Sequence, residues 1–311
     1  MNTTTIKKEF NLASKLVNGI LGIKPVYELA KRQARDMMIK RGSKIGVNWD
    51  ANVAELKGQD WSTEIAQLED TNLSYPPYYV CSFHAYAKGN LDWEPAWEVE
   101  SAALTVHSTI WSGSKNPQAD GDAKLRESYH QNLLKYISPS PTKILDFGCS
   151  VGMSTFALKK LYPESQITGL DLSPYYLAIA QYRTKKNQVG GVNWKHAAAE
   201  STGFEANSFD LISSCLVFHE LPQSASRDIF QESYRILQPG GYFALMDMNP
   251  QSPIYQKMPP YILTLLKSTE PYLDEYFSLE IAKAIQEAGF KEPTIIANSP
   301  RHRTVIARKS F

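Results

Sequence analysis

The spacing of hydrophobic and polar positions changes near residue 142. Beyond it, short apolar runs alternate with segments whose apolar residues recur every three or four positions, a pattern typical of a parallel sheet covered by helices on both faces. The expected strands are 144–147, 166–171, 192–196, 209–218 and 242–247. The expected helices between them are 154–161, 175–185 and 226–237, the last ended by Gln238–Gly241. The pattern therefore predicts an α/β domain.

The end of the chain departs from this alternation. A predicted helix at 279–290 precedes two short apolar runs, 294–297 and 304–307, which flank a polar stretch. Two neighbouring strands joined by a short loop pair in antiparallel fashion. We therefore expect a mostly parallel sheet that ends in an antiparallel C-terminal hairpin.

The first 124 residues follow neither pattern. Residues 25–42, with a proline at the start and a glycine at the end, predict a helix, and residues 1–24 predict a loose helix or an arm. Residues 71–113 mix aromatic residues with prolines and glycines and predict loops and short helices. Two interpretations stay open for this mainly helical extension. Its aromatic residues either attach an irregular subdomain to the core or line a cap over a ligand.

Composition narrows the class of protein. The chain has 311 residues, 43% of them hydrophobic, and a net charge of +1, so no basic field indicates a nucleic-acid partner. The cysteines, Cys81, Cys149 and Cys215, match neither a disulfide framework nor a metal site. With no long apolar run, we expect a cytoplasmic protein without an integral membrane segment or a metal.

Candidate chemistry begins where the first strand ends. Asp146 is followed by a small-residue turn from Gly148 to Gly152 and then by a helix start. Glycines let a ligand approach the backbone, and a helix N-terminus offers free N–H groups. Asp171 closes the second strand, where an acidic residue binds ribose hydroxyls in dinucleotide-type folds. The turn is GxxxG and not GxGxxG, which favours a ligand without a pyrophosphate.

Five motifs, taken in order, carry a resemblance. They are Ile144-Leu-Asp-Phe-Gly-Cys-Ser-Val-Gly152, Gly169-Leu-Asp-Leu-Ser-Pro174, Ala199-Glu200, Phe209-Asp-Leu-Ile-Ser-Ser214 with His219-Glu-Leu-Pro222, and Leu237-Gln-Pro-Gly-Gly241. This series resembles the class I S-adenosylmethionine-dependent methyltransferases, and most closely their type 11 or UbiE-like branch. The resemblance covers residues 125–311 and implies their Rossmann-like seven-stranded fold. Residues 1–124 resemble no module, and we treat them as a separate N-terminal extension.

The resemblance implies a role for individual residues toward S-adenosylmethionine. Asp146, Phe147, Gly148, Cys149, Ser150 and Gly152 surround its methionine moiety, Asp171 binds the ribose, Leu172 lies beside the adenine, Ala199 and Glu200 lie at the adenine edge, and Cys215 is close to the methionine end. Two positions depart from the family pattern. Ser150 replaces the third glycine of the usual turn, and Ala198 replaces an aspartate that often precedes Ala-Glu.

The reaction implied is in-line methyl transfer to O, N or C of a small, partly hydrophobic or aromatic acceptor. His219 and Glu220 follow the fourth strand and are the best candidates for a catalytic pair, with His219 as general base. Equally open is that His219 fixes its loop or packs against the cofactor. The histidines of the extension, His84 and His107, are interpreted as structural.

An apolar insertion at 249–277 is expected to contribute to the acceptor pocket and, with residues 71–113, to close a lid. A dimer surface has the same composition, so a monomer and a homodimer both stay open. One alternative function is an S-adenosylmethionine-binding protein without transferase activity, which the departure at Ala198 keeps open. A nicotinamide oxidoreductase is disfavoured by the turn and the terminal hairpin.

Overall fold

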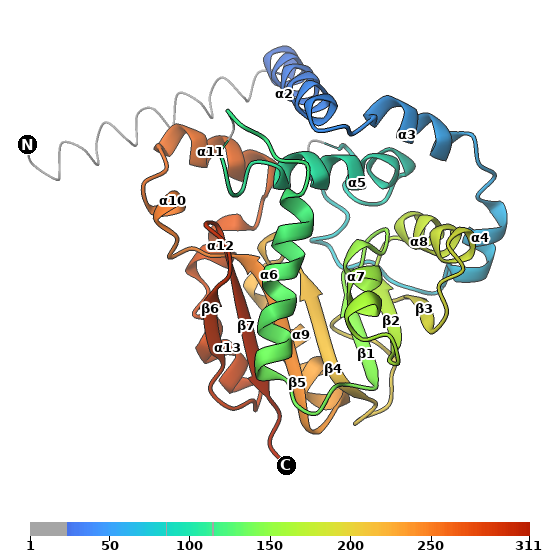
Figure 1. Ribbon diagram of the computed structural model, residues 1–311, viewed down its shortest axis with the longest axis vertical. Helices are drawn as coiled ribbons and strands as arrows, with labels where there is room; N and C mark the ends of the chain where they lie inside the picture. The colour runs from blue at the N-terminus through green and yellow to red at the C-terminus, as the bar shows by residue number, and fades with distance from the viewer. Residues whose placement is uncertain (1–23, 85, 114) are drawn as a thin grey trace, which may run out of the picture.

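The computed structural model describes residues 24–84, 86–113 and 115–311. Within them, seven strands form one sheet in the order β3-β2-β1-β4-β5-β7-β6 (Figure 1). The strands are β1 (Lys143–Phe147), β2 (Gln166–Asp171), β3 (Val192–His196), β4 (Phe209–Cys215), β5 (Leu237–Met248), β6 (Thr294–Ala297) and β7 (His302–Arg308). Strands β1 to β5 pair in parallel, whereas β7 pairs antiparallel with β5 and β6. This confirms the mostly parallel sheet with its antiparallel C-terminal hairpin.

The strand order places a switch point at the centre of the sheet. Strand β1 lies between β2 and β4, so the chain leaves β1 in one direction and later returns on its other side. In open parallel sheets, ligands bind at the carboxyl ends of the strands beside such a point. The carboxyl ends of β1, β2 and β4 carry Asp146, Asp171 and Cys215, so the topology gathers three of the predicted site residues along one edge.

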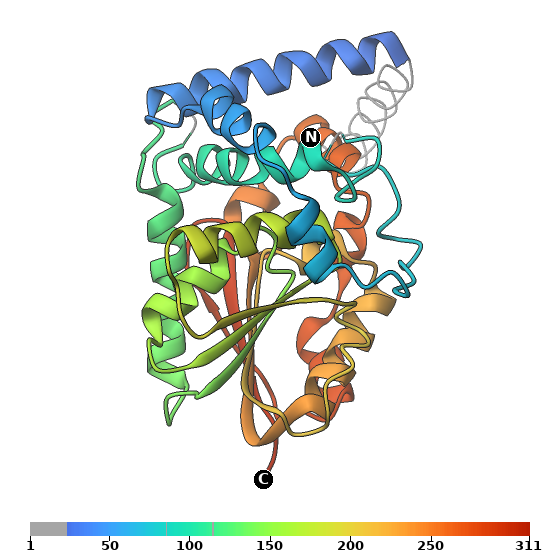
Figure 2. The same cartoon turned by 90° about the vertical axis from the view of Figure 1, so that its right-hand side faces the viewer.

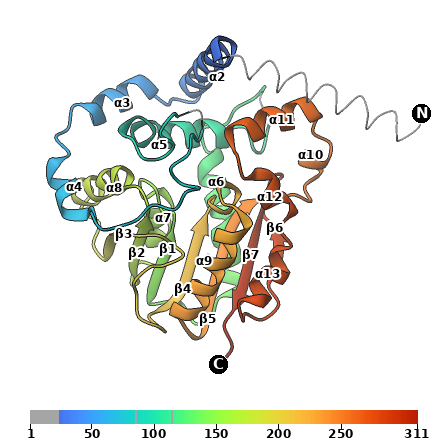
Figure 3. The same ribbon diagram turned by 180° about the vertical axis from the view of Figure 1, so that it is seen from behind.

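Helices cover both faces of the sheet, as the alternation predicts. Helices α6 (Gly121–Tyr136) and α7 (Met153–Leu161) lie in front of it in Figure 1, and α9 (Gln223–Ile236) and α13 (Ile281–Glu287) lie in front of it in Figure 3. Each face has its own apolar core. Leu125 and Leu133 of α6 are fully buried on the first, and Phe230 and Phe243 pack edge to face on the second.

The N-terminal extension lies across the carboxyl ends of the parallel strands (Figures 1 and 2). Its helices are α2 (Lys24–Lys44), α3 (Trp49–Lys57), α4 (Ser62–Leu68) and α5 (Trp93–His107). Trp61 stacks on Trp93 with ring centroids 5.4 Å apart and meets Tyr182 of α8 (Pro174–Lys186) edge to face at 5.5 Å. The tryptophans therefore attach the extension to the core, which is one of the two interpretations left open. The prediction for residues 1–23 lies outside the described residues.

Two helices are longer than the sequence pattern predicts. Helix α5 has 15 residues, where only loops and short helices are expected, because Pro95 falls in its first turn, where proline is tolerated. The Asp92 side chain caps this helix by accepting from the Trp93 N–H at 2.8 Å. Helix α6 begins at Gly121, four residues before the helix that the sequence pattern of residues 125–137 predicts.

Two strand boundaries also differ from the prediction. Strand β4 ends at Cys215, not Phe218, because the chain bends at Leu216, whose φ is +62°. Strand β5 begins at Leu237 and contains Gln238–Gly241, the stretch expected to separate helix from strand. A shift in the β4–β5 register absorbs these residues, and Gly240 supplies a φ of +79°.

The insertion after β5 forms helices α10 (Pro253–Gln256), α11 (Pro260–Thr269) and α12 (Leu273–Ser278). It meets the extension where the His84 N–H donates to the Thr269 carbonyl oxygen at 3.1 Å. Both segments therefore lie over the same edge of the sheet. No helix among the described residues is both long and apolar enough to cross a membrane.

Candidate cofactor and acceptor site

The turn after β1 requires glycine at two positions. Gly148 has a φ of +60° and Gly152 one of +86°, and a Cβ on Gly148 would lie 2.5 Å from Cγ2 of Val217. Ser150 adopts a φ of +49° although it has a side chain, a conformation that costs an L-residue about 1–2 kcal/mol. Its N–H donates to Oδ2 of Asp171 at 2.8 Å. The turn is thereby tied to the end of β2.

Asp146 is fully buried at the carboxyl end of β1. Its Oδ2 accepts from the hydroxyls of Ser154 and Thr155, each at 2.7 Å, whereas its Oδ1 is buried and has no partner within residues 24–84, 86–113 and 115–311. Burial raises the pKa of this carboxyl to about 6. A buried carboxylate oxygen without a donor is costly, so this atom is suited to an N–H donor of a ligand.

Asp171 has a similar environment at the end of β2. Its Oδ1 accepts from the Ser173 N–H at 2.8 Å, and its Oδ2 accepts from the Ser150 N–H. Burial raises the pKa of Asp171 to about 6. A carboxylate offers about four lone-pair sites, so Asp171 keeps capacity for a hydroxyl donor.

Tyrosines of the extension contact two of the predicted cofactor residues. The Tyr79 hydroxyl lies 3.4 Å from Oδ1 of Asp171, and the Tyr78 hydroxyl donates to Oε1 of Glu200. The other oxygen of Glu200 is buried and finds no partner among the residues described, and burial raises the pKa of this carboxyl. Tyr75 stacks on Tyr79 at a centroid distance of 6.3 Å. The sequence marks these tyrosines only by their density and does not indicate which residues they contact.

The predicted adenine side lies between β2 and β3. Leu172 is buried, and its carbonyl oxygen is 2.9 Å from Nε2 of His196, the last residue of β3. Ala198 and Ser201 form an isolated bridge that turns the chain at the partly buried Ala199. Residue 198 is an alanine and has no carboxylate. The carboxylate of this segment is therefore that of Glu200.

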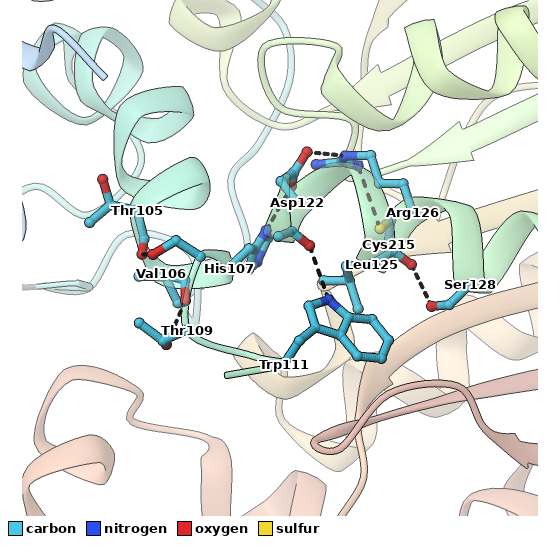
Figure 4. Close-up of polar contacts among 12 residues, drawn as sticks. Thr105, Val106, His107, Thr109, Trp111, Asp122, Leu125, Arg126, Ser128 and Cys215 are labelled. Atoms are coloured by element: carbon cyan, nitrogen blue, oxygen red, sulfur yellow. Dashed lines mark hydrogen bonds and ion pairs between the residues drawn. The ribbon is translucent and has the colours of Figure 1, made fainter. Parts of the chain in front are cut away.

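Cys215 belongs to a chain of buried polar contacts (Figure 4). Nη1 of Arg126 lies 3.8 Å from the Cys215 sulfur, and its Nε donates to Asp122 at 2.9 Å. Asp122 in turn lies 2.7 Å from Nδ1 of His107. Burial raises the pKa of Cys215 to about 12, so it is a thiol at neutral pH. Sequence reasoning missed Arg126, a single arginine of a predicted helix, although it brings a positive charge to the end of β4.

His219 pairs with an aspartate that the sequence analysis does not select. It lies in a short 3-10 helix, η1 (Phe218–Glu220), and its Nδ1 is 2.8 Å from Oδ1 of Asp247, near the end of β5. Asp247 also accepts from the N–H groups of His219 and Met248. Burial lowers the pKa of His219, but the Asp247 carboxylate outweighs it and raises the pKa to about 10. The imidazole is therefore protonated at neutral pH.

Glu220 lies where three distant segments meet. Its Oε1 is 3.9 Å from Nε2 of His84 in the extension, and the same nitrogen lies 2.6 Å from Oε1 of Glu270 in the insertion. Burial raises the pKa of Glu220 to about 7. His84 therefore lies beside a predicted catalytic residue, a position that its place in the sequence does not indicate.

Comparison with known proteins identifies the core. A family model described as a methyltransferase domain matches residues 145–245. An uncharacterized methyltransferase of Synechocystis sp. is 30% identical over 165 residues, which cover 53% of this chain and 74% of that protein. The chain belongs to the class I S-adenosylmethionine-dependent methyltransferases. Its cofactor is accordingly S-adenosylmethionine, as the resemblance implies.

Other similarities of this methyltransferase are more distant. Demethylmenaquinone methyltransferase of Listeria monocytogenes is 27% identical over 195 residues, 57% of this chain and 81% of that protein. A putative O-methyltransferase structure from Nostoc punctiforme has a TM-score of 0.54 at 14% identity, covering 88% of this chain and 69% of that one, and shows a shared fold. Phosphoethanolamine N-methyltransferase 2 of Haemonchus contortus aligns with a TM-score of 0.47 at 18% identity, covering 58% of this chain and about half, 52%, of that one.

The residues at the switch point fit the cofactor of this methyltransferase. Oδ1 of Asp146, Oγ of Ser150 and Oε2 of Glu200 are buried polar atoms without partners among the described residues. The cofactor is rich in amino and hydroxyl donors, which such atoms require.

Proposed function

We propose that this protein transfers the methyl group of S-adenosylmethionine to a small, partly hydrophobic acceptor. The observation that carries the proposal is the pair of buried carboxylates, Asp146 and Asp171, at the ends of neighbouring strands. They are linked through the Ser150 turn, and both keep acceptor capacity. This arrangement suits a ligand with an ammonium group at one end and vicinal hydroxyls further along.

Each part of the cofactor has a proposed partner. Oδ1 of Asp146 accepts from the ammonium group of the methionine moiety, and the Arg126 guanidinium binds its carboxylate. Asp171 accepts from the ribose hydroxyls, taking over from the long contact to Tyr79. The adenine lies between Leu172 and the segment 199–200. The bound cofactor supplies a methyl group already activated on a sulfonium, so the protein has to align the acceptor and exclude water.

The acceptor is proposed to lie beside His219 and Glu220, under a roof built from the extension and from the insertion 249–277. The contact between His84 and Glu270 joins the two parts of this roof. Tyr78 and Tyr272 meet edge to face at 6.4 Å and join them at a second place. Two segments that meet over the carboxyl edge support the proposal of a lid that shields the reaction from water.

We divide the roles of the catalytic pair by their protonation. The sequence-based role of His219 as general base stays a prediction. Because Asp247 keeps the His219 ring protonated at neutral pH, we propose instead that His219 donates a hydrogen bond to the acceptor. Glu220, with a pKa of about 7, is the better proton acceptor. Where the acceptor must lose a proton, Glu220 takes it as the methyl group is transferred.

A labelled-cofactor screen tests the proposal. The protein is incubated with S-adenosylmethionine carrying a labelled methyl group and with small-molecule extracts, and both S-adenosylhomocysteine and labelled products are measured. We expect turnover that Glu220→Gln reduces at least tenfold without weakening cofactor binding. Tight cofactor binding without any product would instead support a binding protein, and full activity of Glu220→Gln would refute the proposed base.

Asp171 provides a test of the cofactor site. Asp171→Ala is expected to weaken S-adenosylmethionine binding by at least a hundredfold in calorimetry, because the ribose loses its acceptor and the Ser150 turn loses its anchor. The matched control is Asp210→Ala. Asp210 also accepts from backbone N–H groups, those of Thr142 and Lys143, but at the opposite edge of the sheet. Equal affinity of the two variants would contradict the assignment.

A further inference from the structure

Arg303 in β7 is a buried cation that the proposed reaction does not use. Arg303 is only 7% exposed, and its guanidinium carbon lies 5.6 Å from the centroid of the Tyr276 ring. Nη2 donates to the Tyr276 hydroxyl at a long 3.4 Å, and Nε is buried without a partner among the residues that the structure describes. Within that part of the chain, most of the hydrogen-bonding capacity of this guanidinium is therefore unused.

No carboxylate in the described part of the chain forms an ion pair with Arg303. Asp247 lies directly opposite it in the β5–β7 register, but its carboxylate is engaged by His219. Arg126 differs from Arg303 in this respect, because it is also largely buried but forms an ion pair with Asp122. A buried charge is costly unless it is paired, so Arg303 is suited to an anion from outside the chain.

Arg303 lines a groove of about 480 Å³ at the edge of the sheet. The groove lies among α12, α13 and β6, which are neighbours in Figures 1 and 3. Phe277, Ile281 and Ile295 supply apolar walls, and Ile295 is 43% exposed on the edge strand. Lys283 lies at the rim, where its Nζ is 3.9 Å from Oε2 of Glu280.

We propose that this groove binds a small organic anion with an apolar body, of the carboxylate or phosphate monoester class. The planar guanidinium of Arg303 matches the two oxygens of such a group. The charge of Lys283 is offset, because its Nζ lies 3.9 Å from Oε2 of Glu280, which also lines the groove, and 4.0 Å from Oε1 of Glu287. The apolar body of the ligand packs against Phe277, Ile281 and Ile295. The groove contains neither the proposed cofactor residues nor His219 and Glu220, although Phe277 belongs to the insertion 249–277 and Arg303 lies opposite Asp247 in the β5–β7 register. The inference does not depend on the proposed reaction.

Calorimetric titration of the full chain with hexanoate and with hexyl phosphate tests this inference, with hexanol as the uncharged control. We expect saturable binding of at least one anion, tenfold or more tighter than hexanol. Tighter binding of hexanoate would indicate a carboxylate ligand, and tighter binding of hexyl phosphate a phosphate monoester. No saturable binding of either anion, or equal binding of hexanol, would overturn the proposal.

Variants separate the groove from non-specific effects. Arg303→Gln is expected to lose anion binding by at least tenfold while S-adenosylmethionine still binds, which also shows that the variant is folded. Arg227→Gln, which removes an exposed arginine paired with Glu287, is expected to bind the anion as the wild type does. Ile295→Glu places a negative charge on the exposed wall and is expected to weaken binding without disturbing the core. Unchanged binding in Arg303→Gln or in Ile295→Glu would refute the site.

Discussion

Single residues at the switch point are governed by burial. Asp146 and Asp171 both lie at the ends of parallel strands, where their side chains are shielded from solvent. Burial raises their pKa values to about 6, although Ser154, Thr155 and backbone N–H groups lower them in part. Their ionisation therefore falls within reach of ordinary buffers.

This shift predicts that cofactor binding depends on pH. S-adenosylmethionine needs both carboxylates ionised, so its affinity should fall as the pH drops from 7.5 to 5, by about tenfold for each carboxylate that must lose its proton. Arg126 opposes the shift at Asp146, and Asp171 adds to it. Calorimetry at pH 6 in buffers of different ionisation enthalpy should detect protons released on binding. An affinity that stays constant between pH 7.5 and 5 would contradict it.

The same shift makes a prediction for the protein without cofactor. The native pKa values of about 6 exceed the unfolded value of 3.8, so between these limits the native state holds protons that the unfolded state has lost. The free energy of unfolding should therefore decrease as the pH rises from about 4 to about 6, as far as these two groups are concerned. Asp171→Asn removes one of them, and the slope measured in urea denaturation should become shallower. An unchanged slope would contradict the shift.

The pair of His219 and Asp247 makes a second prediction at this scale. In the wild type, the His219 ring should stay protonated at pH 8, because Asp247 raises its pKa to about 10. In Asp247→Asn that support is lost while burial still lowers the pKa, so the ring should titrate well below the wild-type value, although Glu270 and Glu220 still raise its pKa. Proton NMR of the imidazole in both proteins measures this. Titration of wild-type His219 below pH 8 would argue against a fixed ion pair.

At the scale of elements, the turn between β1 and α7 combines two demands on glycine. Gly148 needs a positive φ, and it also cannot carry a side chain, because a Cβ would lie only 2.5 Å from Cγ2 of Val217. Gly46 needs only the positive φ of +84°, because a Cβ there would meet nothing within 4 Å. Comparing substitutions at the two glycines therefore separates the cost of backbone strain from the cost of a steric clash with Val217.

Gly46→Ala should destabilise the protein by about 1–2 kcal/mol through backbone strain alone. Gly148→Ala should cost more, because Val217 must also move. It should also weaken cofactor binding, because the added methyl group displaces the turn that is proposed to hold the cofactor. Urea denaturation and calorimetry measure the two effects. Equal loss of stability in both variants, with normal cofactor affinity in Gly148→Ala, would mean that the close approach is unimportant.

At the scale of the whole molecule, the extension and the core share buried polar groups. The Tyr78 hydroxyl donates to Glu200 across a sequence separation of 122 residues. Glu200 has a second oxygen without a partner, so Tyr78 is the donor that compensates its burial. The junction between the two parts is thus polar at the site and aromatic at α4 and α8.

This junction predicts unequal effects of two similar substitutions. Tyr78→Phe leaves the Glu200 carboxylate without its donor and should lower the free energy of unfolding by about 1–3 kcal/mol. Tyr162→Phe removes a buried hydroxyl that has no partner in the described part of the chain, so it should be neutral or stabilising. Chemical denaturation of the two variants measures the difference. A neutral Tyr78→Phe would indicate that the extension is not held at Glu200.

The sequence by itself determined the sheet, its antiparallel hairpin and the turn at Gly148–Gly152. These depend on residues close together in the chain, whose periodicity and turn chemistry are local. The sequence-based predictions were wrong where the tertiary structure placed a proline or a glycine in a setting that its neighbours in the chain do not indicate. Pro95 lies in the first turn of α5, where proline is tolerated, and Gln238–Gly241 forms a bulged part of β5.

Only the tertiary structure decided which side chains surround the proposed site. Arg126 reaches Cys215, Asp247 holds His219, and His84 meets Glu270, in each case from a different segment of the chain. Contacts of this kind follow from the crossover of β1 and β4 and from the two segments that cover the carboxyl edge. They set the charges at the site, because burial and a single charged neighbour shift a pKa by several units, and neither can be read from local sequence.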